Sequence, residues 1–132
     1  MKISNLASTV DLTRALGHPA RLRAVAVLRT GELCVCQIKE VLGLAQSTVS
    51  THLRELKRAG LITERKDGRW VYFGLSSDPD ARIWIDVALK SLEGDPQLES
   101  DDHLVEDLRR LPVADLCKLG YADAKAKAGR GN

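Results

Sequence analysis

The 132-residue sequence lacks the features of membrane and secreted proteins. No apolar run approaches the roughly 20 residues that a membrane-spanning helix needs. The start of the chain, residues 1–5, does not have the charged-then-apolar layout of a signal peptide. We therefore expect a cytoplasmic protein with no membrane partner, in which the three cysteines are reduced thiols rather than disulfides.

Motifs of common enzyme sites are also missing. The sequence contains no C-x-x-C pair, no G-x-S-x-G nucleophile elbow and no glycine-rich loop of the kind that binds phosphate. We therefore do not expect an enzyme. Two alternatives stay open: a thiol oxidoreductase with an exposed, low-pKa cysteine, and an architectural DNA-binding protein in which the cysteines have no role.

Charge is distributed unevenly along a chain whose net charge is only +2. Residues 1–75 carry twelve basic and six acidic side chains, whereas residues 76–116 carry four basic and eleven acidic ones. With 44% apolar residues the chain can bury one core. A basic first part followed by an acidic segment predicts that one face of the molecule binds a polyanion.

Apolar periodicity, with glycine and proline at the segment ends, predicts a mainly α-helical (α+β) chain with about five to six helices. The expected helices cover residues 6–16, 19–30, 34–42, 47–59 and 79–93, with a weaker one near 101–111.

Two β-prone runs interrupt this pattern at residues 61–66 and 69–75. The Asp67-Gly68 pair between them predicts a β-hairpin with a type I′ turn. We place one domain at residues 1–93 and a C-terminal extension at 94–132. The small, polar tail from Ala122 is expected to be disordered.

The helix expected at residues 79–93 is apolar around most of its circumference. Only Asp86, Lys90 and Glu93 form a narrow polar stripe. Such a helix must be covered on more than one side. This favours a homodimer, although a central core helix in a monomer remains an alternative.

The helices expected at 34–42 and 47–59 are joined by a short connection, which is typical of a helix-turn-helix. A helical projection puts Val49, Leu53 and Leu56 on the core side. The opposite side then carries two hydroxyls and two arginines, which suit a DNA groove and its phosphates: Ser47, Thr51, Arg54 and Arg58. The hairpin tip adds Arg65, Lys66 and Arg69, interleaved with Trp70 and Tyr72.

Four segments resemble the ArsR/SmtB family of metal-responsive repressors: residues 15–23 (ALGHPARLR), 31–38 (GELCVCQI), 46–53 (QSTVSTHL) and 60–72, which runs from Gly-Leu-Ile to Trp-Val-Tyr. The resemblance covers about residues 10–92. It implies a winged helix-turn-helix homodimer, with terminal helices at the interface, that binds double-stranded operator DNA when free of ligand. The N-terminal helix and the helix at 79–93 would form that interface, so residues 1–93 would be the DNA-binding and dimerisation domain. The expected DNA contacts are Gln46, Ser47, Thr48, Ser50, Thr51, His52, Arg54, Arg58, Lys66 and Arg69.

Residues 32–36 (ELCVC) resemble the metalloid-binding motif of arsenical-sensing family members. The resemblance implies that Cys34 and Cys36 bind As(III) or Sb(III) as a regulatory ligand, with no permanently bound cofactor, and thiolates suit soft acceptors. The best-known arsenical repressors carry a third cysteine where this chain has Lys39. Cys117 is the remaining candidate for a third ligand, or else an incidental thiol in the tail.

Residues two apart on an intact helix point roughly 200° away from each other and cannot share one ion. We therefore predict that ligand binding opens the first turn of the helix at 34–42, with Cys36 on the solvent side near Lys39 and Glu40. Cys34 lies on the same helix face as Ile38 and Val41, which are expected to be buried. Opening that turn would disturb the helix at 47–59, which is the recognition helix of the helix-turn-helix, and this gives negative coupling between ligand and DNA.

Other sensors of this family suggest alternative ligands. Members that sense cadmium or lead carry additional N-terminal cysteines, and the first 33 residues here contain none. Zinc-binding members use carboxylates and histidines on the last helix. This chain offers only Asp101, Asp102, His103 and Glu106 there, so we do not expect a zinc site. A thiol redox switch on the same fold stays open, and His18 and His52 are expected to pack or cap.

Overall fold

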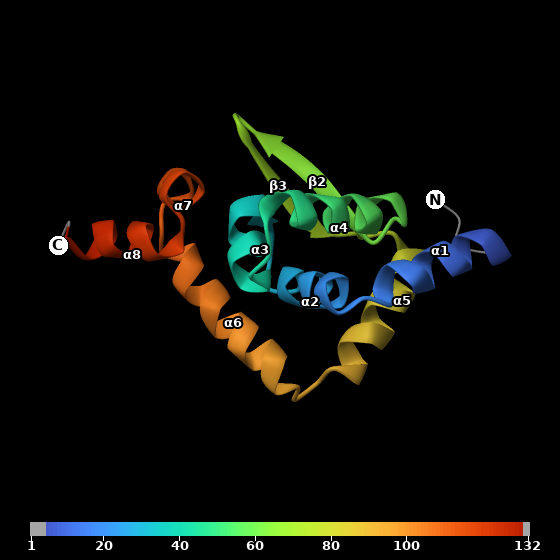
Figure 1. Ribbon diagram of the computed structural model, residues 1–132. Helices are drawn as coiled ribbons and strands as arrows, with labels where there is room; N and C mark the ends of the chain where they lie inside the picture. The colour runs from blue at the N-terminus through green and yellow to red at the C-terminus, as the bar shows by residue number, and fades with distance from the viewer. Residues whose placement is uncertain (1–4, 131–132) are drawn as a thin grey trace.

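The computed structural model describes residues 5–130. The predictions for residues 1–4, at the start of the chain, and for residues 131–132 of the tail lie outside the described residues. Eight helices and a small sheet form the described chain (Figure 1). The elements are α1 (Leu6–Leu16), α2 (Pro19–Leu28), β1 (Leu33–Cys34), α3 (Val35–Leu42), α4 (Gln46–Arg58), β2 (Ile62–Asp67), β3 (Trp70–Leu75), α5 (Pro79–Ser91), α6 (Pro96–Arg109), α7 (Val113–Leu119) and α8 (Tyr121–Arg130). The mainly α winged-helix prediction is confirmed, with more helices than the five to six expected.

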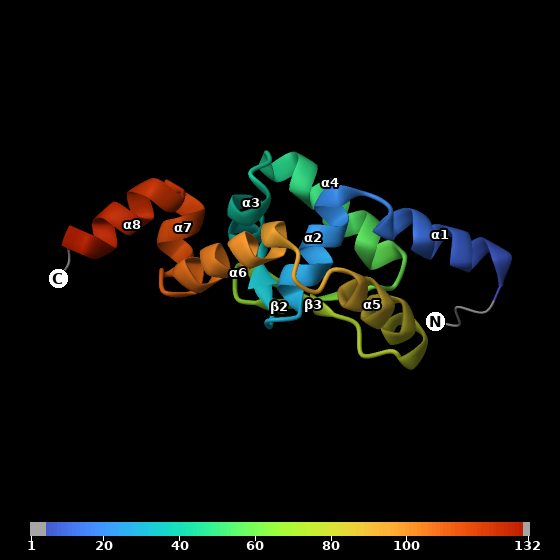
Figure 2. The same cartoon turned by 90° about the horizontal axis from the view of Figure 1, so that it is seen from below.

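Helix α2 lies at the centre of the molecule. It contacts α1, α3, α4, α5, α6 and strand β3. Helices α1 and α5 lie at one end, whereas α7 and α8 lie at the other, as two views at right angles show (Figures 1 and 2). Helices α1 and α8, the first and last elements of the described chain, are therefore far apart, with the helix-turn-helix between them.

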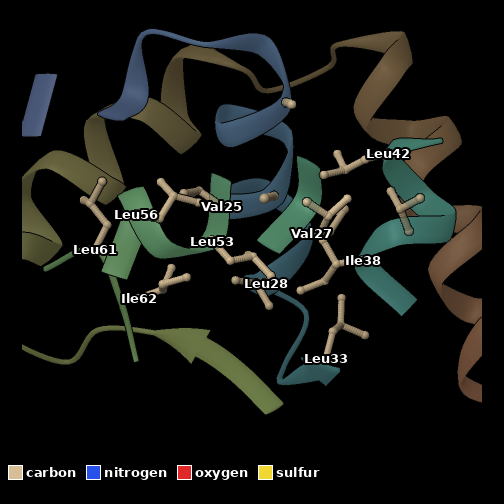
Figure 3. Packing of buried hydrophobic residues seen from close by; sticks show 14 of the residues in the cluster. Val25, Val27, Leu28, Leu33, Ile38, Leu42, Leu53, Leu56, Leu61 and Ile62 are labelled. Atoms are coloured by element: carbon tan, nitrogen blue, oxygen red, sulfur yellow. The ribbon is translucent and has the colours of Figure 1, made fainter. Parts of the chain in front are cut away.

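The hydrophobic core forms where α2 meets α3, α4 and the sheet (Figure 3). Full burial of a branched aliphatic side chain contributes about 1.5–3 kcal/mol. Val49, Leu53 and Leu56 of α4 are all at most 2% exposed, which confirms the predicted core side of this helix. Their neighbours in the core include Val25, Val27, Leu28, Leu33, Ile38, Leu61 and Ile62.

The wing is a hairpin within a three-stranded antiparallel sheet of order β1-β3-β2. Asp67 pairs with Trp70, so the two turn residues are Gly68 and Arg69, one position later than predicted. Gly68 has a φ of 62°, and no residue other than glycine has a positive φ in the described chain. Positive φ at the first central position alone is the type II′ pattern, in which only that position needs glycine. The predicted type I′ turn at Asp67-Gly68 is therefore wrong.

The C-terminal segment is more helical than predicted. Helix α6 begins at Pro96 rather than near residue 101, because Asp95 caps it by accepting the Gln97 N–H at 2.8 Å. Helices α7 and α8 follow, so the disorder expected from Ala122 is wrong as far as Arg130. Four alanines in α8 explain this result, since alanine has the highest helix propensity.

A bidentate salt bridge connects α6 to α2. Nε and Nη2 of Arg23 each donate to one carboxylate oxygen of Asp101 at 2.9 Å, and Asp101 is only 3% exposed. These hydrogen bonds raise the pKa of Arg23 above its ordinary value. Arg23 also donates to the Val41 carbonyl of α3 at 3.0 Å. One guanidinium thus joins α2, α3 and α6.

Replacing the buried carboxylate should loosen α6. We expect Asp101→Asn to lower the free energy of unfolding by about 2 kcal/mol, because hydrogen bonds to charged groups are worth roughly 1.5–3 kcal/mol. Asp102→Asn is the matched control, since its pair with Arg29 is about one-third exposed and such pairs are worth at most about 1 kcal/mol. Urea unfolding at one protein concentration measures both. Equal losses for the two variants would contradict the assigned role of Asp101.

Candidate functional site

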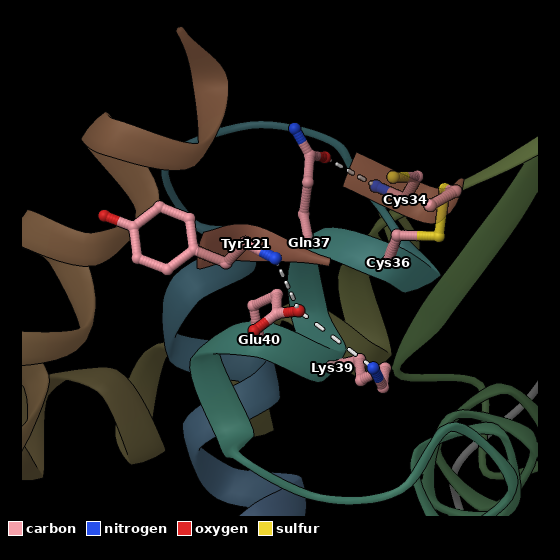
Figure 4. Close-up of a disulfide and its surroundings, with 7 residues drawn as sticks. Cys34, Cys36, Gln37, Lys39, Glu40 and Tyr121 are labelled. Atoms are coloured by element: carbon pink, nitrogen blue, oxygen red, sulfur yellow. Dashed lines mark hydrogen bonds and ion pairs between the residues drawn. A yellow bond between two sulfur atoms is a disulfide. The ribbon is translucent and has the colours of Figure 1, made fainter. Parts of the chain in front are cut away.

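Cys34 lies just before α3 rather than inside it (Figure 4). Its backbone is extended, with φ −85° and ψ 166°, because it pairs with Tyr72 of β3. Its N–H donates to Oε1 of Gln37 at 2.9 Å, so the side chain three residues later satisfies the N-cap backbone. The helix expected at 34–42 thus begins at Val35.

The three cysteine sulfurs come together at this helix start. The Sγ atoms of Cys34, Cys36 and Cys117 all lie within 4.8 Å of one another. The 200° separation expected for two residues on one helix does not apply, because Cys34 is extended and only Cys36 is helical. The predicted opening of the first turn is therefore not needed to gather the sulfurs, and that part of the prediction is wrong.

Helix α7 supplies the third sulfur. Cys117 and Cys36 form a disulfide, whereas Cys34 is a free, buried thiol that is 1% exposed. The expectation that all three thiols are reduced is wrong for this pair. Cys36 is 8% exposed rather than solvent-facing, because α7 packs on α3 and covers it.

A surface hollow of about 260 Å³ adjoins the disulfide. Its wall joins α3 and α7 to the start of α4, since Gln46 is the first residue of α4. The hollow is lined by Cys36, Lys39, Glu40, Gln46, Leu116, Cys117, Lys118, Leu119 and Gly120. The cysteine site and the start of the recognition helix are therefore direct neighbours.

Most of the predicted DNA-contacting residues lie on exposed surface. Eight of them are exposed, on α4 and at the hairpin: Gln46, Ser47, Thr48, Thr51, Arg54, Arg58, Lys66 and Arg69. Ser50 and His52 are half-buried. The exposed set shares one helix and one hairpin, as a groove-binding surface requires.

His52 packs inside the fold. Its ring lies 4.5 Å from the ring of His18, and Arg21 Nη1 lies 3.3 Å from its Nδ1. Burial first, and then the nearby His18 and Arg21, lower the pKa of His52. His18 accepts the Ala20 N–H at 3.1 Å and so caps α2. Both histidines thus pack or cap, in line with their predicted structural roles.

Several cations of this surface are already paired. Arg65 donates to Glu32 at 3.0 Å and lies 3.8 Å from Asp67, so its charge is largely compensated. Arg58 pairs with Glu55 at 3.0 Å. Within residues 5–130, by contrast, no salt bridge involves Arg54, Lys66 or Arg69. Their positive charges are therefore available to a binding partner.

The carboxylates considered for zinc are used elsewhere. Asp101 and Asp102 bind Arg23 and Arg29. Among the described residues, the three cysteines are the one group of three or more cysteine, histidine and acidic side chains close enough to hold a metal ion.

The cap by Gln37 was not predicted from the sequence, although a glutamine three residues after the N-cap is a known capping signal.

No helix in the described part of the chain is long and apolar enough to cross a membrane.

Comparison with known proteins gives consistent results. The family model "Bacterial regulatory protein, arsR family" matches residues 18–64. The chain is 38% identical over 80 residues to the arsenic resistance transcriptional regulator ArsR1 of Pseudomonas putida, covering 60% of this chain and 61% of that protein. It is 32% identical over 108 residues to the regulator ArsR2 of the same organism, covering 80% of this chain and 92% of that protein.

A solved structure shares the fold. It is the homodimeric winged helix-turn-helix DNA-binding domain Mb0332 of Mycobacterium bovis, a possible ArsR-family regulator. The TM-score is 0.59 at 28% identity, over 66% of this chain and 81% of that one. The relatives are transcriptional regulators rather than enzymes, as the missing enzyme motifs predicted. The chain therefore belongs to the arsR family of bacterial regulatory proteins.

Proposed function

We propose that the chain is a cytoplasmic, homodimeric repressor that leaves its operator DNA when trivalent arsenic or antimony binds Cys34, Cys36 and Cys117. The observation that carries this proposal is the gathering of three sulfurs within 4.8 Å beside the helix-turn-helix. Two relatives named as arsenic resistance regulators support the ligand class.

The donor set suits a soft, three-coordinate ligand. Thiolates select soft acceptors, and all three members of the cluster are cysteines. Arsenite, As(OH)₃, would react with three thiols to form three As–S bonds and release three waters. Cys36 and Cys117 must first be reduced, with two electrons and two protons supplied by a cellular thiol reductant.

The coupling to DNA follows from the position of the site. Cys36 lies in the first turn of α3, which packs against α4, and Gln46 of α4 lines the same hollow. Binding of one ion by Cys36, Cys117 and the buried Cys34 would bring the three sulfurs closer together and so shift α3 or α7 relative to α4. Ligand and DNA would then favour different arrangements of the same helices, which is negative coupling between two sites.

The proposed DNA surface is the exposed side of α4 together with the hairpin. In a helix-turn-helix, the N-terminal residues of the second helix contact base edges while the first helix crosses the backbone. Gln46, Ser47 and Thr51 would lie nearest the bases. Arg54, Lys66 and Arg69 would bind phosphates or guanine edges.

The proposed dimer interface combines α1 and α5, which lie at the same end of the molecule (Figures 1 and 2). Both helices expose large apolar side chains four residues apart. Leu6 and Val10 of α1 are 82% and 39% exposed, and Ile83 and Val87 of α5 are 62% and 63% exposed. A second copy would remove these side chains from water, in line with the homodimeric relative.

Thiol substitutions test the metalloid site. With reduced protein, we expect arsenite to raise the Kd for a duplex selected from a random-sequence pool by about 5–150-fold, the usual range for allosteric coupling. Cys34→Ala, Cys36→Ser and Cys117→Ser should each abolish this effect, because each removes one of three ligands. Fluorescence anisotropy measures duplex binding.

The control for this test is duplex binding without arsenite, which all three variants should retain. Unchanged arsenite release in Cys117→Ser would remove Cys117 from the site. Undiminished duplex binding by the wild-type chain with arsenite bound would contradict the proposed function.

The disulfide favours a second candidate function, a thiol redox switch. Oxidation of Cys36 and Cys117 by hydrogen peroxide would form the disulfide and two waters, because the thiols pass two electrons and two protons to the peroxide. Cys34 has no part in this bond. The two candidates thus require different sets of cysteines.

Cys34→Ala separates the two candidates. If metalloid binding controls release, this variant should lose its response to arsenite under reducing conditions. A redox switch should leave it fully responsive to hydrogen peroxide, whereas Cys117→Ser would lose both responses. Duplex release by peroxide alone, with arsenite inert toward the reduced wild-type chain, would favour the redox switch and contradict the metalloid proposal.

Charges placed on the exposed apolar surface should separate the protomers. We expect the double variant Ile83→Glu/Val87→Glu to sediment as a monomer, because like charges would be buried against apolar partners. Both residues are exposed in the single chain, so its helix content should be unchanged. Arg110→Glu, at the residue that follows α6, is the control and should remain dimeric. A dimeric double variant would exclude this part of α5 from the interface.

A further inference from the structure

The C-terminal segment 113–130 has no role in the function proposed so far beyond supplying Cys117. Residues 117–132 carry four basic side chains and one acidic one, in contrast to the acidic segment before them. Within the described chain, Lys127 pairs with Asp115 at 2.9 Å and Lys125 lies 3.9 Å from Asp107. Lys118 forms no salt bridge there, and it is exposed.

Lys118 lies on a helix that is firmly attached to the helix-turn-helix. Leu116 of α7 is 2% exposed, and Cys117 is bonded to Cys36 of α3. The N–H of Tyr121 donates to Oε1 of Glu40 at 3.3 Å. The backbone of Lys118 is therefore held in place, so binding a partner needs to order only its side chain.

The surface around Lys118 is continuous with the proposed DNA surface. Lys118 and Lys39 line the same hollow as Gln46, the first residue of α4. The Glu40 carboxylate in this hollow is engaged by Tyr121 and lies 4.0 Å from Lys39. Two cations beside the start of a recognition helix suit a phosphate, since the helix-turn-helix brings the DNA backbone close to its first helix.

We propose that α7 extends the DNA-binding surface, with Lys118 and Lys39 binding a backbone phosphate beside the start of α4. This inference rests on the proposed DNA binding. It gives the C-terminal extension a function: Cys117 anchors a phosphate contact, so a change at the thiols moves both the recognition helix and this contact.

The salt dependence of binding tests the proposal directly. Log Kobs falls as log salt concentration rises, and each neutralised phosphate makes this negative slope steeper by about 0.9. In the full-length chain without metalloid and at one thiol state, we expect Lys118→Ala to make the slope shallower by about 0.9 per protomer, or roughly 2 per dimer. The duplex is one selected from a random-sequence pool by the wild-type chain. The selected consensus should not change, because phosphate contacts carry no direct sequence information.

Two further variants complete the test. Lys118→Arg should restore the slope. Arg110→Ala, which removes an exposed cation just after α6 and outside this hollow, should leave the wild-type slope. A wild-type slope in Lys118→Ala would overturn the inference, as would tighter binding, which would mean that α7 obstructs DNA. Failure of the wild-type chain to select any duplex would instead contradict DNA binding itself.

Discussion

The antiparallel pairing of Leu33 and Cys34 with Phe73 and Tyr72 is the constraint on which the candidate site depends. It keeps Cys34 extended, so α3 starts only after it. Two cysteines that would diverge on a continuous helix can therefore approach one point. The pairing also ties the wing strand β3 to the start of the helix-turn-helix. One short strand thus connects the thiols, the wing and α3, the first helix of the helix-turn-helix.

The third cysteine reaches this point only because the C-terminal segment folds back. Arg23 and the buried Asp101 fasten α6 to α2 and α3. Helix α7 then continues along α3 and brings Cys117 to Cys36, although 81 residues separate them in sequence. An ion pair between helices far apart in sequence thereby helps to place the third thiol of the cluster.

The sequence predicted the parts of the fold that local patterns control. The winged helix-turn-helix, the core side of α4 and the exposed position of Arg54 follow from helical periodicity, which the tertiary structure preserves. The spacing of Cys34 and Cys36 and the family resemblance likewise predicted these two residues as metalloid ligands.

Long-range contacts explain most of what was missed. The strand at Cys34 exists only through its pairing with β3, and the burial of Cys36 only through α7. Local sequence signals also favour the start of α6 at Pro96 and the formation of α8. Asp95-Pro96 repeats the helix start of Asp78-Pro79, and the alanines of α8 favour helix over disorder.

Arsenic X-ray absorption on the reduced, full-length chain, loaded with one arsenite per protomer, tests most directly whether three thiolates hold the metalloid. We predict three sulfur neighbours around arsenic and no oxygen neighbour. The same result is expected when wild-type protein is diluted with a large excess of a Cys34→Ala/Cys36→Ser/Cys117→Ser chain, because mixed dimers then predominate and each site must be built within one protomer. A site with two sulfurs and one oxygen, or loss of the third sulfur in the mixed dimers, would contradict a three-thiolate site built within one protomer.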